Sequence, residues 1–139
     1  MQSPRPRALI VDDNVFFARN LGAFLEAEGW DVQIVNHALH ALGTLKSGPP
    51  PHLLMLDLDL PDISGWGIYG ELLLNPAFPK VPVIIVSRAT WLPQDVPLSG
   101  ILAMVEAPSS PSAWEHFRGV VRPILQARAE QVRSDGGLA

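Results

Sequence analysis

Short runs of hydrophobic residues alternate along this chain with longer stretches in which hydrophobic residues recur every three or four positions. The short runs are typical of strands that are buried on both faces of a sheet. The longer stretches have the period of helices that bury one side. A helix is expected after each strand. The runs predict five strands, at residues 8–11, 32–35, 53–56, 81–86 and 101–105.

Capping and helix-breaking residues mark where the predicted helices begin and end. Asn14 and Ser64 stand where they would cap the helices that follow the first and third strands. The last helix should begin near Pro111. Pro93 and Pro97 limit the helix between the fourth and fifth strands to one or two turns, because proline breaks a helix interior. We therefore expect the fourth helix to be shortened.

The alternation of strands and helices predicts a doubly wound α/β fold, in which a five-stranded parallel sheet is sandwiched by helices. A chain of 139 residues suits one domain. We place that domain at residues 8–131, after a disordered lead-in over residues 1–7 and before a loose tail over residues 132–139. Right-handed crossovers bring the carboxyl ends of the strands to one edge, where open α/β sheets place their ligands.

Composition excludes several classes of function. The net charge is −4 and no basic cluster occurs, which argues against a nucleic-acid surface in this chain. Without cysteine the chain has no disulfide, thiolate metal site or cysteine nucleophile. No hydrophobic run is long enough to span a bilayer, and the N-terminus lacks a signal-peptide core. We therefore expect a cytoplasmic protein without a membrane partner.

Four polar residues follow or close the predicted strands at the carboxyl edge. Asp12 and Asp13 come directly after the first strand, Asp57 follows the third, and Ser87 closes the fourth. A single acid in such a place is usually a turn residue or a helix cap. That explanation fails for four polar residues that share one edge. Three clustered carboxylates repel one another unless a cation is present, and hard oxygen ligands favour Mg²⁺.

Asp57 is the centre of the expected chemistry. A carboxylate beside a divalent cation can act as a nucleophile toward phosphorus and form an aspartyl phosphate. The hydroxyl of Ser87 can hydrogen-bond one of the phosphoryl oxygens. The residue types at this edge therefore indicate phosphoryl transfer to an aspartate.

The sequence resembles a two-component response-regulator receiver domain over residues 8–131. The residues that carry the likeness are the acid pair at positions 12 and 13, the segment at residues 56–65, and Ser87. The resemblance implies a flavodoxin-like fold and a signalling module whose phosphorylation is autocatalytic, rather than a metabolic enzyme.

The resemblance also assigns a role to each matching residue. Asp57 would accept a phosphoryl group from a phosphohistidine of a sensor histidine kinase or a phosphotransfer protein. Mg²⁺ would be bound by Asp13, Asp57 and the backbone carbonyl of Asp59, with Asp12 acting through water. Ser87 would be the hydroxyl switch. Further partners would be an unidentified downstream protein and, weakly bound, a second copy of the chain.

Three positions depart from the pattern of the family. Ala107 precedes Pro108 where the family has a lysine, and Val105 stands where the family has an aromatic switch residue. Arg88 follows the hydroxyl residue, where a small side chain is usual. The resemblance further implies a cis peptide bond between Ala107 and Pro108. The acceptor site is thus expected to be intact while the residues that transmit the signal are altered.

Arg88 is the candidate to replace the missing lysine, since a guanidinium suits two phosphate oxygens at once. The alternative is that its side chain points to solvent or pairs with Asp59. On the first interpretation, Asp57 remains competent but is phosphorylated slowly, with a reduced conformational response. A partner would then read the loop around Arg88 and Trp91.

Two other functions compete with this interpretation. The chain can be a pseudo-receiver that docks to partners and never uses phosphorylation. The segment Asp57-Leu58-Asp59-Leu60 is also similar to the nucleophile motif of haloacid-dehalogenase-type phosphatases. Against the phosphatase, too little chain follows Asp57 to build the rest of that core, and the acid pair precedes the motif instead of following it. Steady turnover of a phosphate ester would favour the phosphatase.

Overall fold

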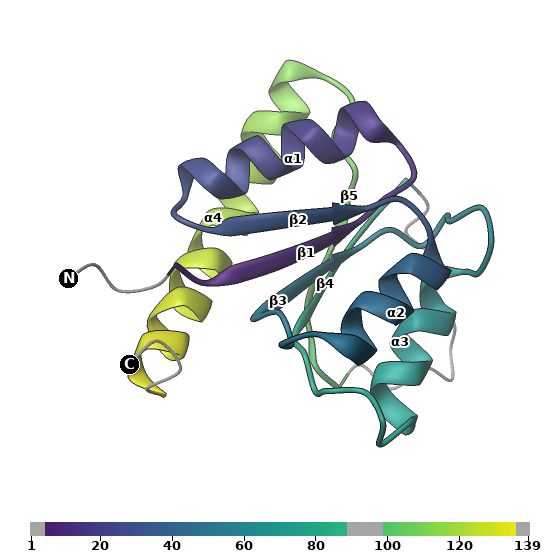
Figure 1. The fold of residues 1–139 in the computed structure, drawn as a ribbon. Coiled ribbons are helices and arrows are strands. Elements are labelled where there is room, and N and C mark those ends of the chain that lie inside the picture. Colours follow the sequence, from purple (N-terminus) through teal and green to yellow (C-terminus); the bar gives the residue numbers. More distant parts are fainter. Residues whose placement is uncertain (1–4, 89–98, 136–139) are drawn as a thin grey trace.

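The computed structural model describes residues 5–88 and 99–135, which form a single parallel sheet flanked by helices (Figure 1). The strand order is β2-β1-β3-β4-β5, and every neighbouring pair is parallel. This confirms the predicted doubly wound fold. The shortened fourth helix was predicted for residues that lie mostly outside the described ranges. The elements in chain order are β1 (Arg7–Val11), α1 (Val15–Ala27), β2 (Asp31–Val35), α2 (Ala38–Ser47), β3 (Leu53–Leu56), α3 (Gly65–Leu74), β4 (Val83–Ser87), β5 (Ile101–Glu106) and α4 (Pro111–Ser134).

The sheet is covered on both faces, with α1 and α4 on one side and α2 and α3 on the other (Figure 1). Successive residues of a central strand point to opposite faces. Ile10 and Met55 therefore pack in the cluster under α1 and α4, whereas Leu9 and Leu54 pack in the cluster under α2 and α3. Burial on both faces is the reason why these strands are continuous hydrophobic runs.

The predicted helix caps are present. The side chain of Asn14 accepts a hydrogen bond from the backbone N–H of Phe17 at 3.0 Å. The hydroxyl of Ser64 accepts one from the N–H of Trp66 at 3.2 Å. Each bond satisfies an N–H group that has no partner within its own helix. The caps therefore fix where α1 and α3 begin, immediately after the acid-bearing ends of β1 and β3.

Residues on either side of the predicted domain range, 8–131, also contact the body of the protein. In the lead-in, the guanidinium of Arg5 donates hydrogen bonds to the backbone carbonyls of Glu26, Gly29 and Trp30, at and just beyond the end of α1. At the other end, α4 continues through Ser134, and Val132 is buried against the body of the protein. Neither α4, with 24 residues, nor any other helix of the described ranges is apolar enough to cross a bilayer.

Gly65 lets α3 begin directly against the strand end that carries Asp57. A Cβ at this position would lie 2.8 Å from the Cα of Leu58 and 3.0 Å from the carbonyl carbon of Asp57. The N–H of Gly65 also donates a hydrogen bond to the carbonyl of Leu58 at 3.0 Å. Any larger residue would push the helix and the strand end apart, because both obstructing groups are backbone.

Replacing Gly65 with alanine should destabilise the protein by about 1–3 kcal/mol, since backbone has to move to make room. The matched control is Gly70→Ala in the same helix, where a Cβ meets nothing within 4 Å. Alanine there should stabilise by about 0.5–1 kcal/mol, because it reduces the flexibility of the unfolded chain. Urea unfolding of both variants tests this. Equal effects at the two positions would contradict the packing argument.

Candidate functional site

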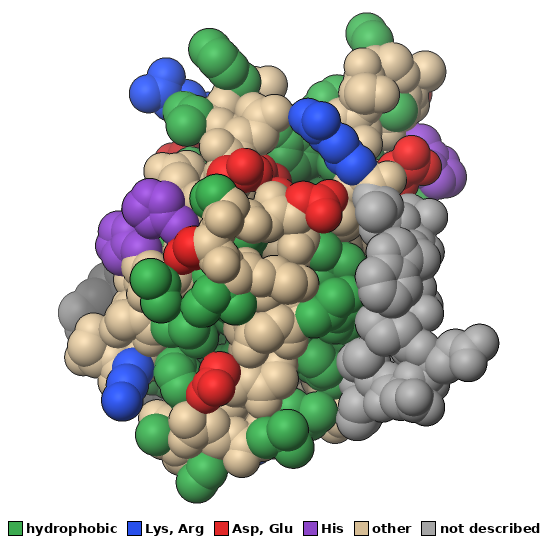
Figure 2. All heavy atoms as spheres, turned by 90° about the vertical axis from the view of Figure 1, so that its right-hand side faces the viewer, with side chains coloured by type: hydrophobic (Ala, Val, Ile, Leu, Met, Phe, Trp, Pro, Cys, Tyr) green, Lys and Arg blue, Asp and Glu red, His purple; other side chains and the backbone are tan. Residues whose placement is uncertain are grey.

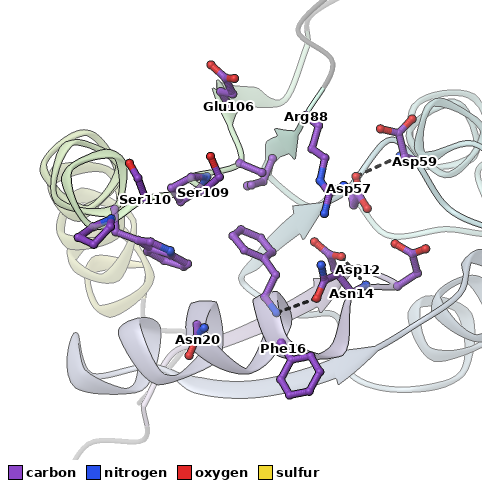
Figure 3. A pocket seen from close by; sticks show the side chains of 17 residues that line it. Asp12, Asn14, Phe16, Asn20, Asp57, Asp59, Arg88, Glu106, Ser109 and Ser110 are labelled. Atoms are coloured by element: carbon purple, nitrogen blue, oxygen red, sulfur yellow. Dashed lines mark hydrogen bonds between the residues drawn. The ribbon is translucent and has the colours of Figure 1, made fainter.

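The ends of the neighbouring strands β1 and β3 bring three carboxylates together. Asp12 and Asp13 follow β1, Asp57 follows β3, and one carboxylate oxygen from each lies within 4.8 Å of the other two. Figure 2 shows this face of the molecule, with acidic side chains gathered on it, and Figure 3 shows Asp12 and Asp57 facing one another. The topology therefore places together residues that are 44 or more positions apart in the chain.

Two of the three carboxylates are buried and held by backbone N–H groups. Asp12 is 6% exposed and Asp57 is 9% exposed, whereas Asp13 is exposed. The carboxylate of Asp57 accepts the N–H of Asp59 at 3.0 Å, and that of Asp12 accepts the N–H of Asn14 at 2.8 Å. Each bond reaches two residues ahead, so the local turn orients the acid toward the centre of the cluster.

Burial raises the pKa of both inner carboxyl groups. Burial, reinforced by the neighbouring acid charges, raises the pKa of Asp57 to about 7, although the N–H of Asp59 opposes it. Burial also raises the pKa of Asp12 to about 6, with the charge of Asp13 adding to the effect and the N–H of Asn14 and the charge of Arg88 opposing it. Ionising these crowded carboxylates is therefore unfavourable without a counter-charge, and their oxygen atoms are suitable ligands for a hard divalent cation such as Mg²⁺.

Ser87 and Arg88 stand at the same edge, at the end of β4 beside β3. Ser87 closes the strand and is 2% exposed. Arg88 extends from the strand end toward Asp57 and Asp12, as Figure 3 shows. Its positive charge lowers the pKa of Asp12. Among the ion pairs of residues 5–88 and 99–135, none joins Arg88 to Asp59, so the geometry favours the interpretation in which Arg88 faces the acids.

A cavity of about 1110 Å³ opens over the carboxylates. It extends from Asp57 along α1 to the connection between β5 and α4, where Ser109 and Ser110 line it (Figure 3). Phe16 at the start of α1 also borders the cavity and is 79% exposed. Phe16 was not predicted from the sequence to be part of the site. Its position near the acid pair, immediately before the buried face of α1, was the one sequence feature that pointed to it.

A model of the response regulator receiver domain family matches residues 8–96. This chain belongs to that family. The match removes the ground for the phosphatase alternative, which rested on a likeness over four residues. Receiver domains are signalling modules of two-component systems, and they bind Mg²⁺ at an acidic pocket.

Curated relatives of this receiver domain are longer proteins. The chain is 29% identical over 126 residues to protein-glutamate methylesterase/protein-glutamine glutaminase 2 of Rhodopseudomonas palustris. That match covers 87% of this chain and 33% of that protein. The chain is 30% identical over 90 residues to the DNA-binding response regulator MtrA of Mycobacterium tuberculosis. That match covers 65% of this chain and 38% of MtrA. The chain thus spans about a third of the length of these relatives.

Solved structures share the fold of this receiver domain. A sensor protein from Polaromonas is 25% identical with a TM-score of 0.74, and the match covers 92% of this chain and 98% of that one. The response regulator TrrA from Thermotoga maritima, solved in complex with Mg(2+)-BeF, is 24% identical with a TM-score of 0.66, covering 83% and 96%. The flavodoxin-like fold implied by the sequence is therefore confirmed.

The receiver domain differs from one sequence prediction at the connection after β5. The Ala107–Pro108 peptide bond is trans, so the predicted cis bond is wrong. Trans is the lower-energy form of such bonds by about 0.5–1 kcal/mol, and Ala107 carries no charged group for a cis turn to direct at Asp57. Instead, the N–H of Ala107 donates to the carbonyl of Ser87 at 3.0 Å. Val105 packs against the cluster under α1 and α4.

Asp57→Asn should stabilise the cation-free receiver domain by about 2 kcal/mol near pH 8, roughly half of what the full pKa difference implies because solvent screens part of the charge, and by much less near pH 5. The pKa of Asp57 is about 7 in the folded state and 3.8 in the reference state, so unfolding free energy falls as the pH rises between these values. Above pH 7 the buried carboxylate of the wild type is ionised at a cost in stability, and asparagine removes that charge.

Urea unfolding in the presence of a chelator checks the sign. The control is Asp59→Asn, which removes an exposed charge from the same connection and should change stability little at either pH. An effect of Asp57→Asn that does not vary with pH would contradict the raised pKa.

Proposed function

We propose that this receiver domain accepts a phosphoryl group on Asp57, from a phosphohistidine of a sensor histidine kinase or a phosphotransfer protein, in a reaction that requires Mg²⁺. The observation that carries the proposal is the cluster of Asp12, Asp13 and Asp57 beneath an open cavity. Response regulators typically interact with sensor kinases and downstream effectors. The setting would be cytoplasmic signalling.

The residues present suit the proposed cation. Asp13, Asp57 and the backbone carbonyl of Asp59 would bind it directly, and Asp12 would bind it through water. When bound, Mg²⁺ would offset the repulsion among the carboxylates and supply positive charge to the incoming phosphoryl group. The complex of TrrA with Mg(2+)-BeF supports this role, since that protein has the same fold.

Asp57 supplies the nucleophile. A carboxylate oxygen of Asp57 forms a bond to phosphorus while the phosphorus–nitrogen bond of the phosphohistidine breaks, and the departing imidazole takes up a proton. Asp57 has to be ionised for this step, and its burial opposes ionisation. The N–H of Asp59 keeps the carboxylate oriented throughout.

Ser87 and Arg88 would receive the new charge. A phosphoryl group adds about −1.5 to −2 charges at neutral pH. The hydroxyl of Ser87 donates to one phosphoryl oxygen, and the guanidinium of Arg88 pairs with two others. The position of Arg88 over the acids supports this assignment. Arg88 would thus do part of the work that a lysine at position 107 does in the family.

The response to phosphorylation would be weak. Ala107 has no charge with which to bind the phosphoryl group, and Val105 has no ring that changes position. A downstream protein would instead read the loop around Arg88 and Trp91; Trp91 lies outside the described residues. Ala107 and Val105 also favour a second candidate function, a pseudo-receiver that docks without phosphorylation. A small-molecule phosphodonor distinguishes the two.

Incubation with acetyl phosphate and Mg²⁺ should add one phosphoryl group to the wild type and none to Asp57→Asn. Intact-mass spectrometry measures the adduct, which should be lost in alkali because it is an acyl phosphate. Absence of an adduct in the wild type, despite bound Mg²⁺, would favour the pseudo-receiver.

Arg88→Ala should form this adduct about tenfold more slowly, since a hydrogen bond between charged groups contributes about 1.5–3 kcal/mol. The matched control is Arg19→Ala, which removes an exposed arginine of α1 that does not line the cavity. The rate and the lifetime of the adduct, followed by mass, are the measurements. If both are unchanged in Arg88→Ala, Arg88 has no part in the reaction.

Mg²⁺ at 100 times its Kd should raise the melting temperature of the wild type by roughly 5–10 °C, because such a ligand stabilises the native state by about 2.7 kcal/mol. Asp13→Ala should respond much less. Glu106→Ala, which removes a carboxylate from the same cavity without removing a proposed ligand, should respond like the wild type. Equal responses of the wild type and Asp13→Ala would show that the site is misplaced.

A further inference from the structure

The helix α2 has no cap of its own. His37 occupies the capping position, and its side chain makes no capping hydrogen bond. Instead, both oxygens of the Asp62 carboxylate accept backbone N–H groups at the start of the helix, from Ala38 at 2.9 Å and from Leu39 at 2.9 Å. The N–H of Leu39, with that of Ala38, lowers the pKa of Asp62. An ionised side chain from the connection between β3 and α3 thus caps a helix that precedes it in the chain.

Asp62 lies in the connection that also contains Asp57 and Asp59. At the start of this connection, the N–H of Asp59 bonds to the carboxylate of Asp57, and at its end the N–H of Gly65 bonds to the carbonyl of Leu58. Within the described part of the chain, the hydrogen bonds that tie the middle of the connection to another element are those of Asp62. The carboxylate of Asp62 therefore anchors the backbone on which Asp59 is carried.

The residue before α2 reaches the other acid-bearing connection. The side-chain amide of Asn36 donates to the backbone carbonyl of Asp12 at 3.0 Å. The N–H of Asp12 in turn donates to the carbonyl of Val35 at the end of β2. The start of α2 is therefore joined to the Asp12 connection through Asn36 and to the Asp57 connection through Asp62. Figure 1 shows this end of α2 at the carboxyl edge of the sheet.

We infer that Asp62 is a positioning residue that couples the cation site to the N-terminal end of α2, an inference that rests on the proposed cation site. A cation that binds Asp57 and the Asp59 backbone restrains the connection on which Asp62 stands. Coupling between two sites is reciprocal, so the cation stabilises the bonds from Asp62 to α2 as much as those bonds favour the cation. An ordinary helix cap would contribute to stability equally with and without the cation.

The test compares Asp62→Ala and Asp62→Asn with the wild type. Titration calorimetry should show Mg²⁺ binding weakened on the order of 10-fold in Asp62→Ala, the size of effect seen when residues that orient metal ligands are removed. Asparagine keeps one carbonyl acceptor, so the Mg²⁺ affinity of Asp62→Asn should lie between that of Asp62→Ala and that of the wild type. The matched control is Asp31→Ala, which removes an exposed aspartate at the opposite end of β2 and should bind like the wild type.

Hydrogen exchange provides a readout that a purely structural cap would not move. In the wild type, Mg²⁺ should slow exchange of the Ala38 and Leu39 amides, the two donors to Asp62. In Asp62→Ala, Mg²⁺ should leave the exchange of these amides unchanged. Equal Mg²⁺ affinity in Asp62→Ala and the wild type would overturn this inference and leave the proposed site standing. Failure of the wild type to bind Mg²⁺ would overturn the proposed site, and this inference with it.

Discussion

Crowding of three carboxylates at the ends of two adjacent buried strands is the constraint on which the rest of this structure depends. Asp12 and Asp57 lose most of their hydration, and their charges repel. Each is held in place by an N–H group two residues further on. Gly65 admits a helix start directly behind Asp57. A cluster that is costly when ionised, yet firmly positioned, is suited to a ligand that brings positive charge.

The positively charged residue near the site differs in position from the family pattern, with arginine at position 88 and no lysine at position 107. Ala107 contributes no charge, whereas Arg88 extends over the acids from the end of β4. On the proposed function, the carboxylate cluster and Ser87 are retained, whereas the charged residue at position 107 and the aromatic residue at position 105 are replaced by alanine and valine. On the inference drawn above, the hydrogen bonds from Asp62 to α2 would couple the occupancy of the site to the surface.

The sequence was sufficient to predict the sheet, because strands buried on both faces are hydrophobic runs. It was also sufficient to predict that Asp12, Asp13 and Asp57 lie together, because right-handed crossovers bring the carboxyl ends of the strands to one edge. It was not sufficient for the bonds of Asp62 and Asn36, since hydrogen bonds between connections far apart in the chain leave no periodic pattern. The burial of Val132 was also not evident from the sequence, because the hydrophobic stripe of α4 is sparse after Leu125.

Carboxyl ¹³C NMR of the two buried acids, titrated with pH in the presence and absence of Mg²⁺, tests the central claim most directly. Without the cation, Asp57 and Asp12 should titrate as a coupled pair with midpoints at about 7 and about 6. With saturating Mg²⁺, both midpoints should fall below the ordinary value for aspartate of about 3.9. Ordinary midpoints without the cation, or midpoints that do not respond to Mg²⁺, would contradict the account.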